Sequence, residues 1–310
     1  MNPDELAKTM SFEILLKQIQ SGEEPEHEEF AVLSDLSVGE AKSLVLNLSV
    51  LNPEKRREVV LRLVNISNDD VGMDFNEVFA SLLKDQDYII RSLAISGLWE
   101  SERPDLIVEF ISFIKKDNSD TVRISAAIAL GRFAMLAANG KLVQAYSDRI
   151  QGTFMEIMDQ LDPVDELWRH CLEAVAPFDA TWIEDAIKHA LASDEYLLRI
   201  SGLNAVSRSA DEGWIRWILD HLKDPESSVR VKAAEACGEL ESDEAVLYLL
   251  PLIQDENEEV RLTTLRALST IGGDFVNKIL SEQQNSDDEF VAEFAKRALS
   301  VEEFDEDTML

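Results

Sequence analysis

Arginine and aspartate recur along the sequence at a spacing that could place charged groups in a row. Arg199, Arg230 and Arg261 follow one another at intervals of 31 residues, and an aspartate stands five or six positions before most such arginines. A row of guanidinium groups could bind phosphate or carboxylate ligands. The fixed distance from an aspartate instead favours ion pairs between neighbouring segments, because charged groups inside proteins are normally paired. We therefore predict a structural Asp–Arg ladder made of Asp85, Arg91, Asp117, Arg123, Arg169, Asp194, Arg199, Asp224, Arg230, Asp255 and Arg261.

Few residues have the types and spacing of a catalytic or metal site. His170 precedes Cys171, but adjacent residues on a helix point about 100° apart, which makes this a poor nucleophile and base pair. Cys237 stands where the repeated pattern has leucine, which predicts a core position. No phosphate-binding glycine loop, HExxH metal motif or GxSxG nucleophile motif occurs. We predict no catalytic residue, no metal and no cofactor.

The charge of the chain restricts its partners. Its 310 residues include 61 Asp and Glu against 29 Lys and Arg, which gives a formal net charge of −32. Nucleic acid and anionic membranes are therefore disfavoured, because binding either of them needs clustered basic side chains. The chain has two cysteines, no basic-then-apolar leader, and no apolar stretch near the roughly 20 residues that span a bilayer. We predict a cytoplasmic protein.

Each 31-residue segment has the pattern of two helices. Apolar residues at helical spacing fill 214–222, and Asp224 then stands where a helix N-cap belongs, with Pro225 at the first helical position. An alanine-rich helix over 227–240 follows, and its small side chains permit close packing. Two short helices cannot bury an apolar face alone, so such pairs must stack on one another.

The second helix of each pair carries a nameable motif. Residues 122–131 read Val-Arg-Ile-Ser-Ala-Ala-Ile-Ala-Leu-Gly, and 229–238 follow a similar pattern. This motif resembles the HEAT repeat, in particular the short bacterial form named after phycobilisome lyases, over about residues 76–300. The resemblance implies an all-α, right-handed α-α superhelix, a HEAT-like solenoid of about seven to eight helix-pair units.

The resemblance is specific for the fold and says little about activity, because family members include scaffolds, assembly factors and a few enzymes. A related helical-repeat hydroxylase builds a di-iron site from several His-Glu pairs, but this chain has only His27-Glu28. A branch that removes DNA bases needs a basic groove, which the net charge opposes. We predict a non-catalytic scaffold, adaptor or assembly factor for a polypeptide. The alternative is a lyase-like or other enzyme that acts on a chromophore-bearing or other protein substrate.

The 31-residue spacing is interrupted once, and the repeat motif is incomplete toward both ends of the chain. Arg123 and Arg169 are 46 residues apart, and the surplus over 132–162 predicts an unusually long first helix over 141–161, either a tolerated insertion or a docking ridge. We predict an N-terminal helix with an acidic linker (1–34), a degenerate helical unit without the arginine (35–75), the solenoid (76–300) and an acidic tail (301–310).

The inner, concave wall of such a stack is the expected binding surface. Positions two and five after each arginine should point into it, and they are mostly neutral in its N-terminal half. Acidic rims would then steer a basic partner. We expect charged side chains at Ser125 and Ser201 to weaken binding without unfolding the chain. The predicted partner-binding residues are Leu93, Ser96, Ser125, Ile128, Cys171, Ala174, Ser201, Asn204, Lys232, Glu235, Thr263 and Arg266.

Overall fold

Helices make up the regular structure of the part of the chain that can be described. The computed structural model describes residues 14, 15, 17–19, 21, 23, 25–70, 72–286, 289 and 291–298, and it contains no strand in them. The predicted acidic tail and most of residues 1–24 lie outside these residues. The prediction of an all-α solenoid is confirmed.

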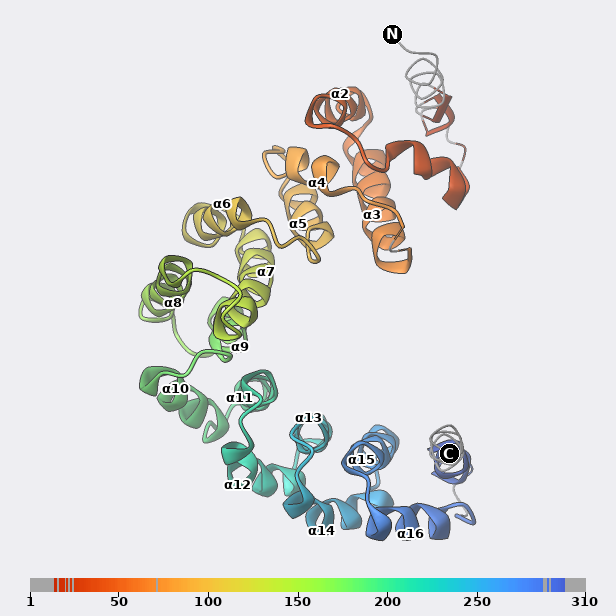
Figure 1. Cartoon of the computed structure of the whole chain (residues 1–310), viewed down its shortest axis with the longest axis vertical. Helices are drawn as coiled ribbons and strands as arrows, with labels where there is room; N and C mark the ends of the chain where they lie inside the picture. The colour runs from red at the N-terminus through yellow and green to blue at the C-terminus, as the bar shows by residue number, and fades with distance from the viewer. Residues whose placement is uncertain are drawn as a thin grey trace. The chain divides into compact units, whose positions relative to one another are not determined.

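The helices follow one another as pairs (Figure 1). A 3-10 helix, η1 (His27–Leu33), precedes the first pair. The first members of the pairs are α2 (Val38–Leu48), α4 (Asn76–Leu82), α6 (Pro104–Lys116), α8 (Gln144–Met158), α10 (Thr181–Leu191), η2–α12–η3 (Glu212–Trp214, Ile215–Ile218, Leu219–Lys223), η4–α14–η5 (Asp243–Ala245, Val246–Leu249, Leu250–Gln254) and α16 (Asp274–Gln283). The second members are α3 (Pro53–Asp69), α5 (Tyr88–Gly97), α7 (Asp120–Ala138), α9 (Glu166–Val175), α11 (Tyr196–Ser209), α13 (Ser227–Glu239) and α15 (Glu258–Ile271).

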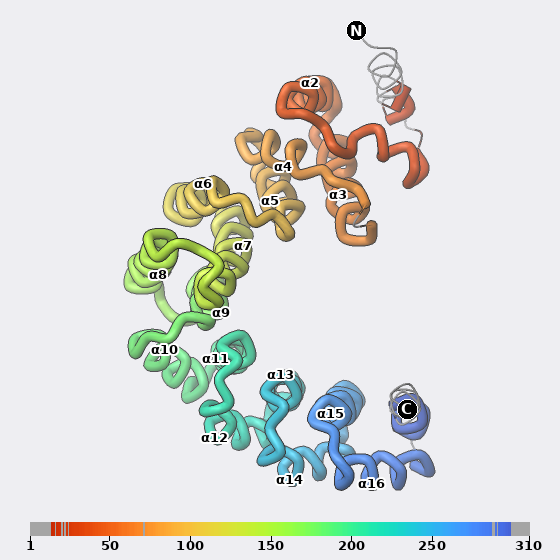
Figure 2. Tube along the Cα trace, in the orientation of Figure 1, coloured from red at the N-terminus to blue at the C-terminus, as the bar shows by residue number. Residues whose placement is uncertain are grey.

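The chain forms two compact units. Unit 1 comprises Met1–Ala137 and Leu142–Ile150, and unit 2 comprises Ala138–Lys141 and Gln151–Leu310. In unit 1, α3 packs on α5 and α2 packs on α4. In unit 2, α9, α11, α13 and α15 pack in succession as one layer, and the first helices form a second layer beside it (Figure 2). We call the layer of second helices in each unit the second-helix layer.

Side-chain caps fix where several helices begin. The Asn52 side chain accepts the backbone N–H of Lys55, and Pro53 takes the first helical position of α3. The Asn257 side chain accepts the N–H of Val260 at the start of α15. These caps satisfy amide groups that have no carbonyl partner within the helix.

The period break lengthens a different helix from the one expected. The helix predicted over 141–161 is α8, which has an ordinary 15 residues, whereas the second helix before it, α7, has 19. Much of the surplus extends α7, because good helix formers such as Met135 and Leu136 continue it after the repeat motif ends.

The length of α7 also corrects the expectation about membrane spans. Among the described residues, α7 is long and apolar enough to cross a membrane by length and composition, with a mean hydropathy of 1.4. It is at the same time the second helix of a repeat, with Val122, Leu130 and Phe133 buried in the stack. A helix that is apolar on most sides is expected inside a layered core as well.

Adjacent second helices approach closely at a glycine. A Cβ atom on Gly238 of α13 would lie 2.9 Å from the Cα atom of Ala267 in α15, which is too close for two carbon atoms. Gly152 in α8, by contrast, has nothing within 4 Å of such a Cβ atom. The glycine of the repeat motif therefore sets the spacing between α13 and α15.

We predict opposite effects for alanine at these two glycines. Gly238→Ala should lower the free energy of unfolding by about 1–3 kcal/mol, because the added methyl group forces two backbones apart. Gly152→Ala should leave it unchanged or raise it by up to about 1 kcal/mol, since alanine is the better helix former. Urea denaturation of both variants measures this, and equal destabilisation would contradict the close approach.

Candidate functional site

We call an ion pair between an arginine of one repeat and an aspartate in the turn of the next repeat a rung of the ladder. A complete rung joins the turns of two successive repeats. The Nε and Nη2 atoms of Arg230 donate to the two carboxylate oxygens of Asp255 at 2.9 and 2.8 Å. Its Nη1 atom donates to the backbone carbonyls of Asp224 and Pro225 at 2.8 and 3.2 Å. One planar guanidinium group thus holds its own turn with one edge and the following repeat with the other.

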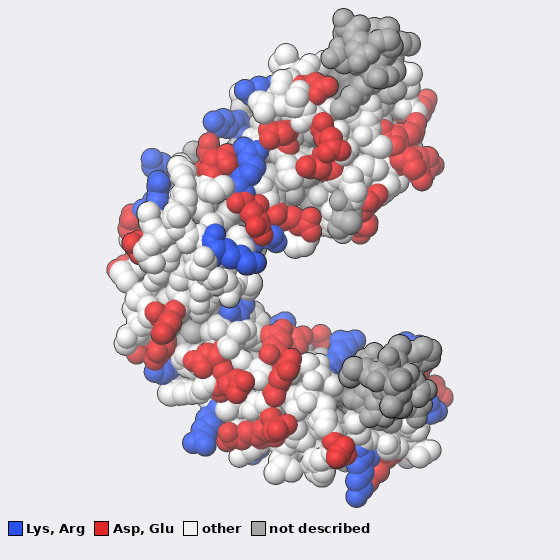
Figure 3. Space-filling view, in the orientation of Figure 1, with Lys and Arg blue, Asp and Glu red and all other residues white. Residues whose placement is uncertain are grey.

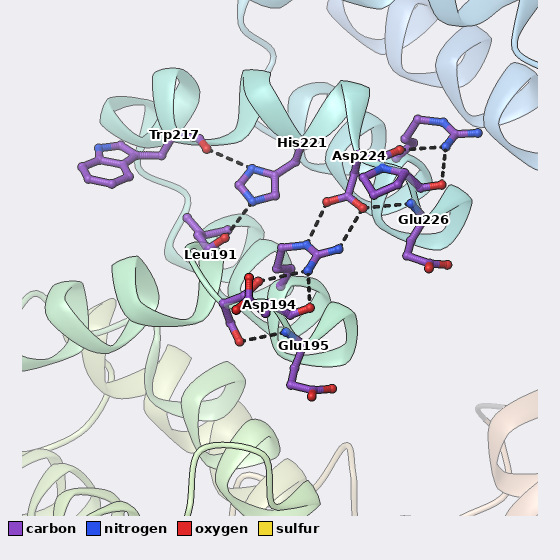
Figure 4. A network of polar contacts seen from close by, with 11 residues as sticks. Leu191, Asp194, Glu195, Trp217, His221, Asp224 and Glu226 are labelled. Carbon is purple, nitrogen blue, oxygen red and sulfur yellow. Dashed lines mark hydrogen bonds and ion pairs between the residues drawn. The ribbon is translucent and has the colours of Figure 1, made fainter.

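Two further arginines repeat this geometry. Arg199 binds both carboxylate oxygens of Asp224 at 2.8 and 2.9 Å, and Arg91 binds those of Asp117 at 2.9 and 2.8 Å. Each aspartate also accepts the backbone N–H two residues later in its own turn, as Figure 4 shows for Asp224 and Glu226. The carboxylate is therefore held by the turn before it receives the arginine.

The ionised state of these aspartates is favoured by their partners. Burial alone would raise the pKa of Asp255, but the hydrogen bonds from Arg230 and from the Asn257 N–H outweigh it and leave the pKa below its ordinary value. The pKa of Asp117 is lowered by the same balance, with Arg91 as the donor. Both rungs therefore contain charged partners at neutral pH.

Residues 35–75 contribute two arginines to rungs, although no such arginine is predicted there from the sequence. Arg56 and Arg57 of α3 bind Asp85 and Asp87 in the turn between α4 and α5, the second pair at 2.7 Å. The prediction that residues 35–75 lack such an arginine is wrong. Arg56 is the fourth residue of α3, as the repeat arginines are of their helices, but Lys55 precedes it where the repeat motif has an apolar residue.

The ladder is interrupted in the middle of the chain. Arg123 donates to the carbonyl of Ile114 at 3.0 Å and to Asp120 of its own helix at 2.9 Å, and not to an aspartate of a following repeat. The Nε atom of Arg169 is buried without a hydrogen-bond partner. These are the two arginines that flank the break in the period.

A serine explains the missing rung at Arg169. Ser193 stands six positions before Arg199, where the other turns have aspartate, and its hydroxyl accepts the Glu195 N–H at 3.1 Å as an aspartate would. Contrary to the sequence prediction, the neighbouring Asp194 contributes only its backbone carbonyl, to Arg199 at 2.9 Å. The last ladder arginine, Arg261, donates to the carbonyls of Asp255 and Glu256 at 3.0 and 3.3 Å.

We predict that an aspartate at position 193 completes the rung. Ser193→Asp should raise the free energy of unfolding by about 1 kcal/mol, because Arg169 would gain a carboxylate without loss of the turn hydrogen bond. The gain should vanish when Arg169 is replaced by Met. Asp194→Asn is the control and should change stability little. A gain that persists in the Arg169→Met background would show that Arg169 is not the partner.

We also predict a specific response to acid. Because the pKa of Asp255 is lowered in the folded chain, its stabilising contribution is present above about pH 4 and is lost as the pH falls through the folded-state pKa. The stability difference between wild type and Asp255→Asn should therefore shrink between pH 5 and pH 2.5. The exposed residue Asp185 provides the control, since Asp185→Asn should differ little from wild type at either pH. A constant difference for Asp255→Asn would contradict the charged rung.

The predicted partner-binding residues all lie on second helices, but they differ in exposure. Ser96, Ile128 and Arg266 are exposed, and Leu93, Ser125, Asn204, Lys232 and Glu235 are half-buried. Contrary to the prediction, four face neighbouring helices and are buried: Cys171, Ala174, Ser201 and Thr263. The Ser201 side chain is 1% exposed, so a charge there would disrupt packing, and the expectation of a harmless substitution is wrong.

In α7 and α13, the outward line runs through positions five and nine after the arginine. Ile128 and Arg132 occupy these positions in α7, and Glu235 and Glu239 occupy them in α13. Residues four apart lie on one face of a helix, so position nine could have been found from position five. Position two turns toward an adjacent helix and is buried in α9, α11 and α15, and position five is buried as well in α9.

An exposed apolar patch marks this line in unit 1. We define the α5–α7 patch as Trp99, Ile128, Arg132 and Met135. The Trp99, Ile128 and Met135 side chains are 46, 53 and 42% exposed. The Arg132 guanidinium lies 5.7 Å from the centroid of the Trp99 ring and 3.3 Å from Glu102. Arg132 therefore connects α7 to the segment that follows α5, and its charge already has a carboxylate partner.

The corresponding surface in unit 2 is polar. A shallow hollow of about 170 Å³ lies between α13 and α15 and is lined by Glu235, Glu239, Arg266 and Thr270, with Gly238 at its floor. Acidic side chains also form groups over both units on the face drawn in Figure 3. The α5–α7 patch thus offers apolar contact area on the second helices of unit 1, whereas the surface between α13 and α15 is polar.

The surroundings of Cys237 and His170 do not favour a reactive role for either side chain. Burial raises the pKa of the Cys237 thiol to about 12, so this side chain is a protonated core residue at neutral pH. His170 lies 3.9 Å from both Glu166 and Glu173 on its own helix, which is beyond a hydrogen bond. Across the described residues, no group of three or more His, Cys, Asp or Glu side chains could hold a metal ion.

Several solved structures match the chain at low sequence identity. An engineered protein of the Northeast Structural Genomics Consortium is 18% identical with a TM-score of 0.41, over 93% of this chain and 88% of that one. Human deoxyhypusine hydroxylase in complex with glycerol is 16% identical with a TM-score of 0.37, over 86% and 96% of the two chains. Importin beta is 13% identical with a TM-score of 0.49, over 91% of this chain and 45% of that one.

The sequence comparisons are narrower. No curated protein matches the chain. A family model described as HEAT repeats matches residues 215–300, which contain α12 to α16. The short phycobilisome-lyase-type subtype stays a prediction. Residues 215–300, which contain the Arg230–Asp255 rung, are therefore similar to HEAT repeats, and this match covers less than a third of the chain.

Proposed function

We propose that this chain is a non-catalytic scaffold that binds a basic polypeptide on its second-helix layer, with the α5–α7 patch as the main apolar contact. The observation that carries the proposal is the exposure of Trp99, Ile128 and Met135 on adjacent repeats. Exposed apolar side chains that adjoin one another are a common mark of protein-binding surfaces.

The charge around the patch supports a basic partner. Glu100 and Glu102 are exposed beside it, and the one basic side chain within it, Arg132, is engaged by Glu102. In a chain with a net charge of −32, an approaching basic segment is attracted over a long range, whereas an acidic one is repelled. A helix with apolar residues on one face and Lys or Arg beside them would fit these features.

The test compares two exposed apolar positions in the same unit. A photo-crosslinking residue at Ile128 should capture one polypeptide in the native host, through a segment rich in Lys and Arg. The same residue at Val108, which is 41% exposed on the first helix α6, should not capture it. With the purified partner, Ile128→Glu should weaken binding at least tenfold and Val108→Glu less than twofold.

Three results would contradict the proposal. They are equal capture at both positions, capture through an acidic segment, and unchanged affinity of a folded Ile128→Glu variant. A small coloured molecule that stays bound during purification would instead favour the alternative, an enzyme that acts on a chromophore-bearing protein.

A further inference from the structure

His221 lies at a junction between two repeats with both ring nitrogens facing carbonyl oxygens. Its Nδ1 atom is 3.1 Å from the carbonyl of Trp217, four residues earlier in the same repeat. Its Nε2 atom is 3.0 Å from the carbonyl of Leu191, which is the last residue of α10 in the preceding repeat (Figure 4). The ring therefore joins the end of α10 to the middle of the next first helix, η2–α12–η3.

The carbonyl oxygens of Trp217 and Leu191 are both acceptors, so hydrogen bonds to both require two N–H groups on the His221 ring. A neutral imidazole has one N–H group and one unprotonated nitrogen, whereas the protonated ring has two N–H groups. With a neutral ring, one lone pair would face a carbonyl oxygen at about 3 Å, and that contact would be repulsive. Only the protonated ring can donate to both Trp217 and Leu191 at the distances seen.

The position of the Leu191 acceptor also favours a positive charge. Leu191 is the last residue of α10, so its carbonyl lies at the C-terminal end of that helix. The carbonyl end of a helix carries partial negative charge and interacts favourably with a cation.

Several charged groups surround the ring. Arg216 and Asp220 of its own repeat line a small hollow together with His221 and Leu191. Arg216 is paired with Glu244 of the next repeat at 3.4 Å. From α10, Lys188 lies over the rings of Trp214 and Trp217 and is bound to Glu184.

Two more charged side chains belong to this junction. Lys223 ends η3, and Asp224, which is paired with Arg199, follows it in the chain (Figure 4). Most of these groups are paired with opposite charges. The two carbonyls are therefore the direct contacts that distinguish the protonated ring from the neutral one.

We propose that His221 is a proton-dependent link between two repeats, which fastens the end of α10 to η3 when the ring is protonated and releases one of its two contacts when the proton is lost. The link is particular to this junction, because the residue 31 positions later is Leu252, which is buried and cannot donate. The proposal does not depend on the proposed partner.

The experiment measures unfolding of the full chain by urea at pH 5.5 and pH 8.0. His221→Gln carries a side chain without a titrating proton, and His189→Gln is the matched control, since His189 is exposed on α10. The ratio of unfolding constants, His221→Gln over wild type, should be about tenfold larger at pH 5.5 than at pH 8.0, because one hydrogen bond to a charged donor is lost. The ratio for His189→Gln should be the same at both pH values.

A second measurement uses the wild-type chain and covers the case in which His221→Gln does not fold. Long-range ¹H–¹⁵N spectra should show both nitrogens of His221 protonated at a pH at which His189 is half titrated. An equal ratio at the two pH values, or a His221 ring that is neutral where His189 is half titrated, would overturn the proposal.

Discussion

A guanidinium group offers five N–H donors in one plane, and the repeats of this chain use that geometry at their turns. In a complete rung, one edge of the arginine binds the carbonyls of its own turn and the other edge binds an aspartate in the next turn, as Arg230 does with Asp255. The apolar faces of the helix pairs drive stacking, but they are nearly interchangeable from repeat to repeat. The rung adds direction and register, because a bidentate ion pair is satisfied in only one relative position of the two turns.

The interruption of the ladder coincides with the irregular part of the sequence. The extended α7 and the 46-residue interval separate Arg123 from the next repeat motif, and Ser193 then leaves Arg169 without a carboxylate. Both changes fall between the regular rungs of Arg91 and Arg199. Arg123 and Arg169 therefore form no bidentate rung with an aspartate. The exposed side chains of the α5–α7 patch lie on α7 and in the turn that follows α5.

The repeat and its helices could be predicted because period, caps and motif all indicate the same structure. The wrong predictions concern the direction of individual side chains, which the 31-residue spacing does not determine. Ser201 and Thr263 are buried because position two after the arginine turns toward a neighbouring helix, and helix contact angles are not written in a linear spacing. Asp194 was assigned to the ladder by residue type, whereas the turn uses the position six before the arginine, which holds Ser193. The patch at Trp99 and Met135 required three-dimensional exposure to be recognised.

The dependence of the stack on its rungs is most directly tested by a double-mutant cycle on Arg230 and Asp255. The single variants Arg230→Met and Asp255→Asn and the double variant are compared with wild type in the free energy of unfolding at pH 7. If the rung joins successive repeats as described, the coupling energy between the two positions is favourable by about 1.5 kcal/mol or more. A coupling energy near zero, with the two losses simply additive, would contradict the account.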